Sequence, residues 1–495
     1  MLFNGSLESR ARRLFALSIS IGLLAIISLV SVLARFTNPP SLRVDLVLIA
    51  VALGGAATSF FLFKWSGFPK VTKASEVFSI SVSFFGSFIG FGSIVYLSSG
   101  VVETLDAGIW EATAGITTTA MSGLDAESLS SSMHIFRSLT QWFGGMSALC
   151  LVFIATPISA KDDIASSGYA SKIFSRSPMG RTKELASIYS ILTVVIFLGY
   201  WIAGMGLFDA ICHSLTTGST GGLSTKSLSI ASFESAAIEW VATVGMLIGG
   251  LNIGILWWLW KRKFKAIGVN TELRLYCIIF LIASLIFWWK LETGLAVLTE
   301  LRTAFFLTAS LISTTGYLTI SWDFASGMTA VMLLVLATGA MAGSTGGGFG
   351  MHRLLRIMKY LRREITLSYR PNAVRAIKVS GEEVEDRELD KLHGYTATFI
   401  FFVAAGAFLV SLASQNLNLE ESISLALSAF VTSGPSFIEQ SSVGFEQNAV
   451  THIALSCLML IGRLSIFPIA YVVLFSVQNF RSNLRGFTRD PVVDS

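Results

Sequence analysis

Long apolar stretches alternate with short polar segments along the whole chain. A stretch of ~20 predominantly apolar residues is long enough to cross the ~30 Å hydrocarbon core of a membrane as a helix. The pattern predicts such helices at residues 14–34, 43–63, 77–98, 136–157, 185–207, 233–260, 275–292, 326–342, 394–412 and 449–478. We therefore expect an all-α polytopic membrane protein, in which the stretch 326–342 is short and ends in glycines.

Four further segments between the spans are too short and too polar to cross a membrane. They align position for position when set back from a shared Thr/Ser turn, as Asp106 to Thr119, Phe208 to Gly221, Arg302 to Thr315 and Glu420 to Ser433. Each is expected to form a half-length helix that enters from the outside and points its C-terminal end at the membrane midplane. Aligned peptide dipoles place about half a negative charge at that end, which favours a cation.

Each of the four segments ends in a turn of Thr, Ser and small residues. Backbone carbonyl groups from four such turns can surround one axis and replace the water around a small cation. The residues predicted to form this filter are Thr118, Thr119, Ala120, Thr220, Gly221, Gly222, Thr314, Thr315, Gly316, Thr432, Ser433 and Gly434. Within this set, the predicted ion ligands belong to Thr119, Gly221, Thr315 and Ser433.

Composition agrees with a membrane protein. Hydrophobic residues make up 53% of the chain and charged residues only 14%, whereas a soluble domain carries about 25% charged residues. The four cysteines lie singly inside apolar stretches without the spacing of a metal site or a disulfide framework, at Cys150, Cys212, Cys277 and Cys457. No motif predicts a covalent cofactor or a nucleic-acid partner.

Lysine and arginine residues gather on one side of the predicted spans. By the positive-inside rule that side is cytosolic, which places both termini in the cytosol and all four Thr/Ser turns toward the outside. We therefore expect a multi-pass protein of the cytoplasmic (inner) membrane. The basic residues on this side include Arg10, Arg12, Arg13, Lys64, Lys161, Lys172, Arg176, Arg181, Lys183, Lys261, Arg262, Lys263, Lys265, Arg481, Arg485 and Arg489.

A glycine-rich loop and a lone arginine interrupt two of the late spans. The loop lacks the Gly-Lys-Ser/Thr ending of a phosphate-binding loop and follows an apolar span, so it is either a helix break that eases packing or a flexible plug below the filter. The arginine, Arg463, costs at least ~2.5–3.5 kcal/mol inside a span, and is either structurally paired or an electrostatic barrier. The predicted gate is Gly343, Ser344, Thr345, Gly346, Gly347, Gly348 and Arg463.

Several local motifs resemble the Trk/Ktr/HKT superfamily of potassium transporters, over residues from about 77 to 478. They are Gln141-Trp142-Phe143-Gly144-Gly145-Met146, Phe208-Asp209-Ala210, His213-Ser214, the loop Gly343 to Gly348, Ser433-Gly434-Pro435 and Gly462-Arg463-Leu464. The extra pair of helices before residue 77 resembles the TrkH branch. The resemblance implies four pseudo-symmetric repeats of span, pore helix and span at 77–160, 161–265, 266–390 and 391–495, after an N-terminal two-helix extension at 1–76.

The same resemblance implies a function and partners. It implies channel-like potassium (K⁺) uptake across the cytoplasmic membrane, gated from the cytosolic side by the glycine loop and Arg463, with K⁺ as the transported ion. It also implies a homodimer and a cytosolic nucleotide-binding regulatory protein of the TrkA/KtrA type. The basic segment Arg353 to Arg363 is either positive charge at the surface of the membrane lipids or the docking surface for that regulator.

Two departures from the family pattern keep other interpretations open. Ala120 stands where the bacterial family usually has Gly, which favours a sodium-permeable transporter of the same fold as the alternative function. Ser465 stands where the TrkH-like pattern often has Glu, and we have no physical account of that change. A membrane enzyme is disfavoured because the five histidines are scattered without a catalytic motif, and a coupled secondary transporter because convincing buried carboxylates are absent from the spans.

Overall fold

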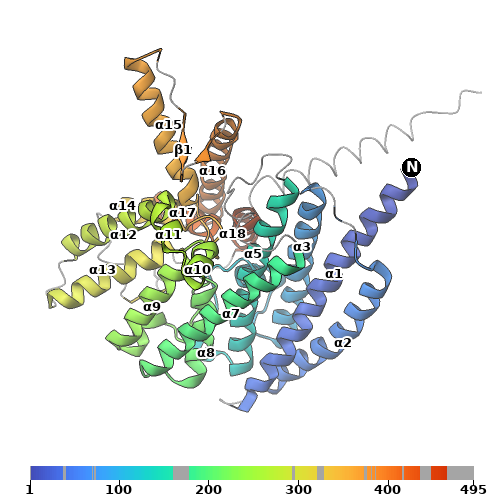
Figure 1. Ribbon diagram of the computed structural model, residues 1–495. Coiled ribbons are helices and arrows are strands. Elements are labelled where there is room, and N and C mark those ends of the chain that lie inside the picture. The colour runs from blue at the N-terminus through green and yellow to red at the C-terminus, as the bar shows by residue number, and fades with distance from the viewer. Residues whose placement is uncertain are drawn as a thin grey trace, which may run out of the picture.

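The computed structural model describes residues 2–36, 41–69, 71, 74–159, 178–291, 296–319, 328–372, 376–380, 382–384, 386–414, 417–434 and 448–464. These residues are almost entirely helical, which confirms the predicted fold class (Figure 1). One small departure is an antiparallel pair of two-residue strands, β1 (Lys378–Val379) and β2 (Glu382–Glu383), with Lys378 opposite Glu383.

Six helices among the described residues are long and apolar enough to cross a membrane. Each corresponds to one of the predicted spans, and α5 (Ser131–Ser159) covers a seventh, 136–157. The protein is therefore a multi-pass membrane protein. The six helices are α1 (Leu2–Val32), α2 (Leu42–Ser66), α3 (Ala74–Ser99), α7 (Pro178–Ile202), α12 (Thr271–Lys290) and α16 (Asp386–Ala413).

The predicted span 233–260 is wrong as a single helix. The chain forms α9 (Ala236–Gly249) and α10 (Ile253–Trp260), which meet at an angle of 100°. The Asn252 side chain caps α10 by accepting a hydrogen bond from the Gly254 N–H at 2.7 Å. A Cβ atom on Gly250 would lie 2.5 Å from the hydroxyl of Tyr276 and 3.2 Å from Ser313, so the missing side chain of Gly250 lets the chain pass close to neighbouring elements at the break. Both halves are apolar, and apolar character alone conceals such a bend.

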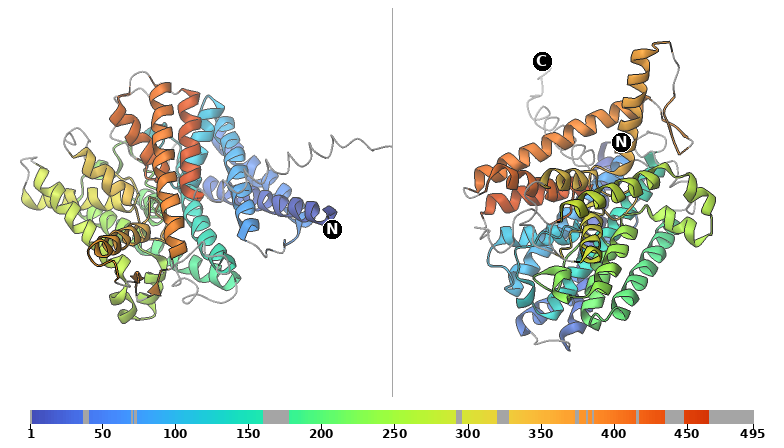
Figure 2. Two further views of the ribbon diagram at one scale, coloured as in Figure 1. Left: turned by 90° about the horizontal axis from the view of Figure 1, so that it is seen from above. Right: turned by 90° about the vertical axis from the view of Figure 1, so that its left-hand side faces the viewer.

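Two of the predicted spans, 326–342 and 449–478, contain shorter helices in the described residues. The stretch 326–342 contains only α14 (Thr329–Thr338), which ends where Gly339 takes a positive φ of 67°. The stretch 449–478 contains α18 (Ala449–Leu464), and its remainder lies outside the described residues together with Ser465, Pro435 and the basic residues of 160–177 and 465–495. After α14 the chain enters α15 (Met351–Tyr369), which projects away from the body of the protein (Figures 1 and 2).

All four predicted half-length helices are present. Two of them begin with a side-chain cap, because Thr104 accepts a hydrogen bond from the Ala107 N–H and Asn418 forms a capping box with Glu421. Each helix ends directly before its Thr/Ser turn. They are α4 (Leu105–Ile116), α8 (Leu207–Gly218), α13 (Val297–Ile312) and α17 (Leu419–Phe430). The remaining short helices are η1 (Leu33–Phe36), η2 (Ala126–Ser128), η3 (Ser229–Phe233) and α11 (Phe264–Val269).

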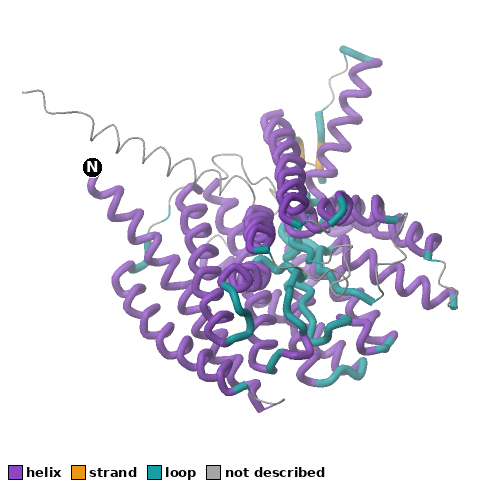
Figure 3. Tube along the Cα trace, turned by 180° about the vertical axis from the view of Figure 1, so that it is seen from behind, coloured by secondary structure: helices purple, strands orange, loops and turns teal. Residues whose placement is uncertain are grey.

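The helices surround a centre that is made of turns and loops (Figure 3). The arrangement closes on itself, since α18 packs against both α17 and α4. At this junction His452 Nδ1 lies 2.6 Å from the Asp106 carboxylate, and the His452 ring stacks on Trp110 at 4.6 Å. The last described helix, α18, is thereby joined to the first half-length helix, α4.

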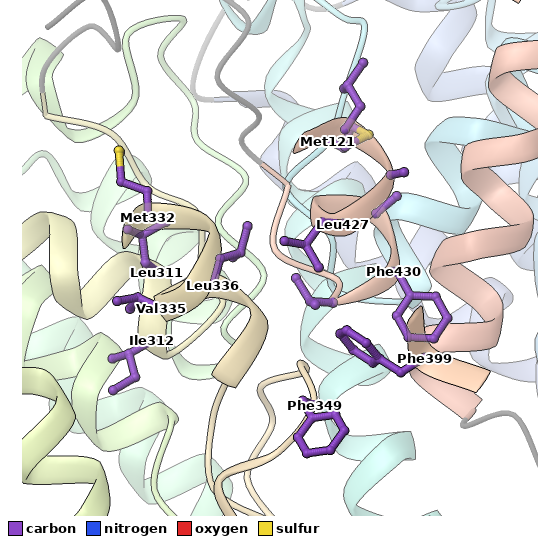
Figure 4. Close-up of a cluster of buried hydrophobic side chains, with 14 of the residues drawn as sticks. Met121, Leu311, Ile312, Met332, Val335, Leu336, Phe349, Phe399, Leu427 and Phe430 are labelled. Carbon is purple, nitrogen blue, oxygen red and sulfur yellow. The ribbon is translucent and has the colours of Figure 1, made fainter. Parts of the chain in front are cut away.

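The largest hydrophobic core cluster supports the half-length helices of the second half of the chain. Leu311 and Ile312 of α13 lie with Met332 and Val335 of α14 on one side of this cluster (Figure 4). Leu427 and Phe430 of α17 lie on the other side with Met121 and Phe399, and Phe349 lies below them. Burial of these side chains positions the C-terminal ends of α13 and α17, where the turns begin.

Candidate functional site

The four turns share an uncommon backbone conformation. Thr118, Thr220, Thr314 and Thr432 have φ values of 57°, 52°, 59° and 55°, in the left-handed region. A residue with a Cβ atom enters that region at a cost of roughly 1–2 kcal/mol. The same strained position occurs second after the end of each half-length helix, which is the kind of backbone outlier that clusters at functional sites.

Three of the turns continue into a glycine that also has positive φ. Gly222, Gly316 and Gly434 have φ values of 73°, 89° and 109°. Ala120 occupies the matching position of the first turn and does not share this positive φ. Instead its N–H donates a hydrogen bond to the Ser433 carbonyl oxygen at 3.4 Å. The first turn therefore reaches its position by a different backbone path.

The turns converge although they are far apart in the sequence. A Cβ atom on Gly222 would lie 2.9 Å from Ala120 Cβ and would also collide with the Thr315 carbonyl oxygen. A Cβ atom on Gly434 would collide with Ala120. The first turn thus touches the second and the fourth, and the second touches the third. The predicted filter residues are brought together at one place.

Within the first turn, and likewise within the third, two hydroxyl groups are hydrogen-bonded to each other. Thr117 Oγ1 lies 2.9 Å from Thr119 Oγ1, and Ser313 Oγ lies 2.7 Å from Thr315 Oγ1. All four of these side chains are fully buried. Their mutual hydrogen bonds satisfy them inside the protein and leave the backbone carbonyl groups as the principal acceptors of the turns.

Gln141 on α5 links the first and second turns, a role that sequence reasoning missed. Its Nε2 donates to the carbonyl oxygens of Thr119 at 3.2 Å and Gly221 at 2.8 Å. Its Oε1 accepts from the Leu223 N–H at 3.3 Å, and the side chain is fully buried. Because Nε2 only donates and Oε1 only accepts, these three partners fix the orientation of the Gln141 amide group. The signal in the sequence was a lone amide inside an apolar span, which does not by itself name a partner.

The glycine loop lies directly against the C-terminal ends of the half-length helices. Thr345 Oγ1 donates to the Gly218 carbonyl oxygen at 3.3 Å, and Thr220 Oγ1 donates to Thr345 Oγ1 at 3.2 Å. The Gly347 N–H donates to Thr314 Oγ1 at 2.8 Å, and a Cβ atom on Gly347 would collide with the carbonyl of Val431. The loop therefore contacts the second, third and fourth turns or the helix ends that precede them.

Two side chains anchor the beginning of this loop. The carboxylate of Glu272 accepts a hydrogen bond from the Ala342 N–H at 2.8 Å. Asn252, at the bend between α9 and α10, donates through its amide to the Ala342 carbonyl oxygen. The Ile253 N–H donates to the Gly343 carbonyl oxygen at 3.0 Å. The bend that the hydrophobic pattern concealed is thus one of the anchors of the loop.

Arg463 contacts the glycine loop, with which it forms the predicted gate. Arg463 Nη1 donates to the Thr345 carbonyl oxygen at 2.7 Å, and Nη2 donates to the Gly144 carbonyl oxygen at 3.5 Å. Within the described part of the chain, these partners are backbone carbonyl groups and not carboxylates. Arg463 therefore joins the loop to α5, and neither of these two partners is an anion that would neutralise its positive charge.

Among the described residues no group of three or more His, Cys, Asp or Glu side chains is arranged to hold a metal ion. The second half-length helix carries Asp209 and His213. Asp209 Oδ1 accepts from Thr225 Oγ1 at 2.6 Å, and His213 Nε2 lies 2.9 Å from Ser224 Oγ. Both side chains thus hold the segment that follows the second turn.

A family model described as "Cation transport protein" and named TrkH matches residues 55–482. The chain belongs to the TrkH family. Members of this family are transporters and not enzymes. The Trk system potassium uptake proteins TrkH of Salmonella typhimurium and of Escherichia coli are each 30% identical to it over 422 residues, covering 82% of this chain and 86% of theirs. The Trk system potassium uptake protein TrkG of Escherichia coli is 27% identical over 477 residues, covering 91% and 94%.

The fold is also that of a solved member of the TrkH family. The crystal structure of the potassium transporter TrkH from Vibrio parahaemolyticus superposes with a TM-score of 0.80 at 23% identity, covering 93% of this chain and 98% of the other. The resemblance to the TrkH branch that the motifs suggested is confirmed.

Proposed function

We propose that this protein takes up potassium through a channel-like pore at the convergence of the four turns. The observation that carries the proposal is the left-handed threonine repeated in Thr118, Thr220, Thr314 and Thr432, at the ends of four helices that meet at one place. Membership in a family of cation transporters and relatives named as potassium uptake proteins support potassium as the ion. No covalent cofactor takes part.

The ion in this proposal is held by backbone carbonyl groups of Thr119, Gly221, Thr315 and Ser433. These residues follow the left-handed threonines and stand at helix C-termini, where the helix dipoles favour a cation. The proposal treats 77–160, 161–265, 266–390 and 391–495 as four repeats that each contribute one turn, after the N-terminal extension 1–76. Three of these oxygens already accept one hydrogen bond each, those of Thr119 and Gly221 from Gln141 and that of Ser433 from the Ala120 N–H. Because a carbonyl oxygen has a second lone pair, each can still bind the ion, and the carbonyl ring replaces the hydration shell of K⁺ without requiring a charged side chain.

The gate in this proposal is the loop Gly343 to Gly348 together with Arg463. The loop blocks the path beneath the turns, and its glycines allow it to move because glycine crosses between backbone conformations at low cost. Arg463 adds a positive charge that repels cations at the same depth. The hydrogen bond from Arg463 to the Thr345 carbonyl oxygen couples the two parts, so displacement of one releases the other.

The proposed orientation places both termini in the cytosol and the protein in the cytoplasmic membrane. On that side α15 follows the glycine loop directly and carries basic residues together with exposed Met358, Leu361 and Ile365. We assign this helix the docking of a cytosolic nucleotide-binding regulator of the TrkA/KtrA type. A homodimer is part of the same proposal and rests on the family resemblance alone.

A second candidate function is sodium-permeable transport by the same pore. The observation that favours it is the different backbone path of Ala120, which breaks the match among the four turns. Fewer well-oriented carbonyl groups hold dehydrated K⁺ less strongly relative to Na⁺.

Uptake in a cell that requires added potassium tests both functions. Expression of this chain in such a cell should restore growth at low potassium, and a large excess of sodium should leave the restored growth unchanged. Growth that is restored only when sodium is low would favour the sodium-permeable alternative. Failure to restore growth by a chain that is present in the membrane, with its regulator supplied, would contradict the proposal.

A further inference from the structure

Two buried polar side chains occupy the same position on the first two half-length helices. Glu111 is the fifth residue before the last residue of α4, and His213 is the fifth before the last residue of α8. Glu111 is 3% exposed and His213 is fully buried. Buried polar groups of this kind are costly unless they are hydrogen-bonded, so their partners indicate what they are there to hold.

Glu111 holds the segment that leaves the first turn. Its carboxylate accepts hydrogen bonds from Ser122 Oγ at 2.8 Å and from the Gly123 N–H at 2.8 Å. Arg137 of α5, itself 3% exposed, donates to Ser122 Oγ at 2.5 Å and lies 3.5 Å from the Glu111 carboxylate. Ser122 comes two residues after Ala120, so this ion pair fixes the backbone immediately beyond the proposed filter.

His213 holds the matching segment of the second turn. Its Nδ1 lies 2.8 Å from the Asp209 carbonyl oxygen and therefore carries the proton that it donates. In the neutral ring Nε2 is then an acceptor, and it accepts from Ser224 Oγ at 2.9 Å. Ser224 comes two residues after Gly222, as Ser122 comes two residues after Ala120.

The two serines also make the same local turn. The Leu124 N–H donates to Ser122 Oγ at 3.2 Å, and the Lys226 N–H donates to Ser224 Oγ at 3.0 Å. Each serine thus binds a side chain of its half-length helix on one side and its own backbone two residues further on. Ser122 and Ser224 therefore make the same two kinds of hydrogen bond, although the helix residue that each one contacts is different.

The third and fourth half-length helices carry an apolar residue at the matching position. The matching residues are Leu307 of α13 and Leu425 of α17, which lie buried in the largest hydrophobic cluster. Among the described residues, it is the first two turns in which a polar side chain of the helix is bonded to a serine of the exit segment. The first of these is also the turn in which Ala120 departs from the backbone shared by the others.

We infer that Glu111, with Arg137, and His213 are positioning residues that set the ion selectivity of the pore from behind the first and second turns. The inference rests on the proposed function, because it assigns these residues to the same ion site. Each one fixes the serine two residues beyond the filter position, and so limits how far the preceding carbonyl groups can rotate. Loss of these hydrogen bonds on either turn lets those carbonyl groups rotate and lowers the discrimination between ions of different size.

Ion flux into liposomes that contain the purified chain measures this effect directly. The readout is the ratio of K⁺ to Na⁺ flux, which a merely structural residue would leave unchanged in correctly inserted protein. Glu111→Gln should lower the ratio about threefold to tenfold, the effect of weakening a charged hydrogen bond. Ser122→Ala and Ser224→Ala, which leave no buried charge unpaired, should each lower it in the same direction, and Ser122→Thr should keep the native ratio.

The matched control is the ion pair between Arg302 of α13 and Glu239 of α9, in which Arg302 Nε lies 2.6 Å from Glu239 Oε2. Glu239→Gln breaks an Arg–Glu pair that does not bond a segment beyond a turn, and should leave the flux ratio unchanged. If Ser122→Ala and Ser224→Ala both keep the native ratio, the inference about selectivity is wrong, but the proposed function as a potassium pore is not contradicted. If the native chain with its regulator carries no K⁺ flux, the proposed function itself fails.

Discussion

At the scale of single residues, the four left-handed threonines are strained, and two of them recover part of the cost through contacts with the glycine loop. Thr314 Oγ1 accepts from the Gly347 N–H, and Thr220 Oγ1 donates to Thr345 Oγ1. The Oγ1 atoms of Thr118 and Thr432 are buried without a hydrogen-bond partner among the described residues. The contacts of the loop therefore fall unevenly on the four turns.

Ala120→Gly should raise the ratio of K⁺ to Na⁺ flux. Glycine adopts the positive φ of Gly222, Gly316 and Gly434 freely, whereas a residue with a Cβ atom loses roughly 1–2 kcal/mol there. A difference of that size corresponds to about fivefold or more in the ratio. Competitive flux of the two ions in liposomes measures it, and an unchanged ratio would mean that the first turn meets its geometry by its hydrogen bond to Ser433.

At the scale of elements, the half-length helices and most spans could be predicted because each has a simple signature in the sequence. A long apolar stretch gives a span, and a shorter segment that ends in Thr or Ser and glycine gives a half-length helix. The bend between α9 and α10 could not be predicted, since both helices are apolar and the close approach of Gly250 to Tyr276 at the bend depends on how the helices pack. A helix with a distinctive composition can be predicted from the sequence, whereas a break in a helix that depends on contacts with neighbouring elements cannot.

Arg463→Ala should raise ion flux through the chain reconstituted without its regulator. The change removes a positive charge and the hydrogen bond to the Thr345 carbonyl oxygen, and a barrier lowered by ~1.4 kcal/mol raises flux about tenfold. Arg463→Lys, which keeps the charge, is the matched control and should stay near the native flux. Flux equal to the native value in well-inserted Arg463→Ala protein would assign Arg463 a structural role.

Removal of residues from the loop Gly343 to Gly348 should also raise flux, by opening the path beneath the turns. Because the loop directly precedes α15, the shortened protein should respond less to an added cytosolic regulator than the native chain. Liposome flux with and without the regulator measures both effects. Native flux together with a native response to the regulator would place the gate elsewhere.

At the scale of the whole molecule, the sequence predicted which residues gather at the centre but not what holds them there. The filter positions follow from the repeated spacing of the turns. The contacts of Gln141 with Thr119 and Gly221, and of Glu111 with Ser122, join segments whose proximity depends on how the helices pack. A single buried amide or carboxylate in a sequence marks a polar contact without naming its partner.

Closure of the helix arrangement depends on the junction of α18 with α4. His452→Leu removes the hydrogen bond to Asp106 and the stacking on Trp110, and should destabilise the folded protein by about 1–3 kcal/mol. Thermal unfolding of the detergent-purified protein measures the loss as a lower midpoint. A midpoint equal to that of the native chain would show that packing of the helices alone closes the arrangement.

The central claim is that the converging turns form the ion site, and substitution of Gly316 tests it most directly. Gly316 has a φ of 89°, which valine adopts only at a high cost, so Gly316→Val should displace the carbonyl groups of the third turn. The measurement is K⁺ and Na⁺ flux into liposomes, made on native and Gly316→Val protein of equal insertion and thermal stability. We predict that the variant loses flux or loses its preference for K⁺. Native flux with native selectivity in the variant would contradict the account.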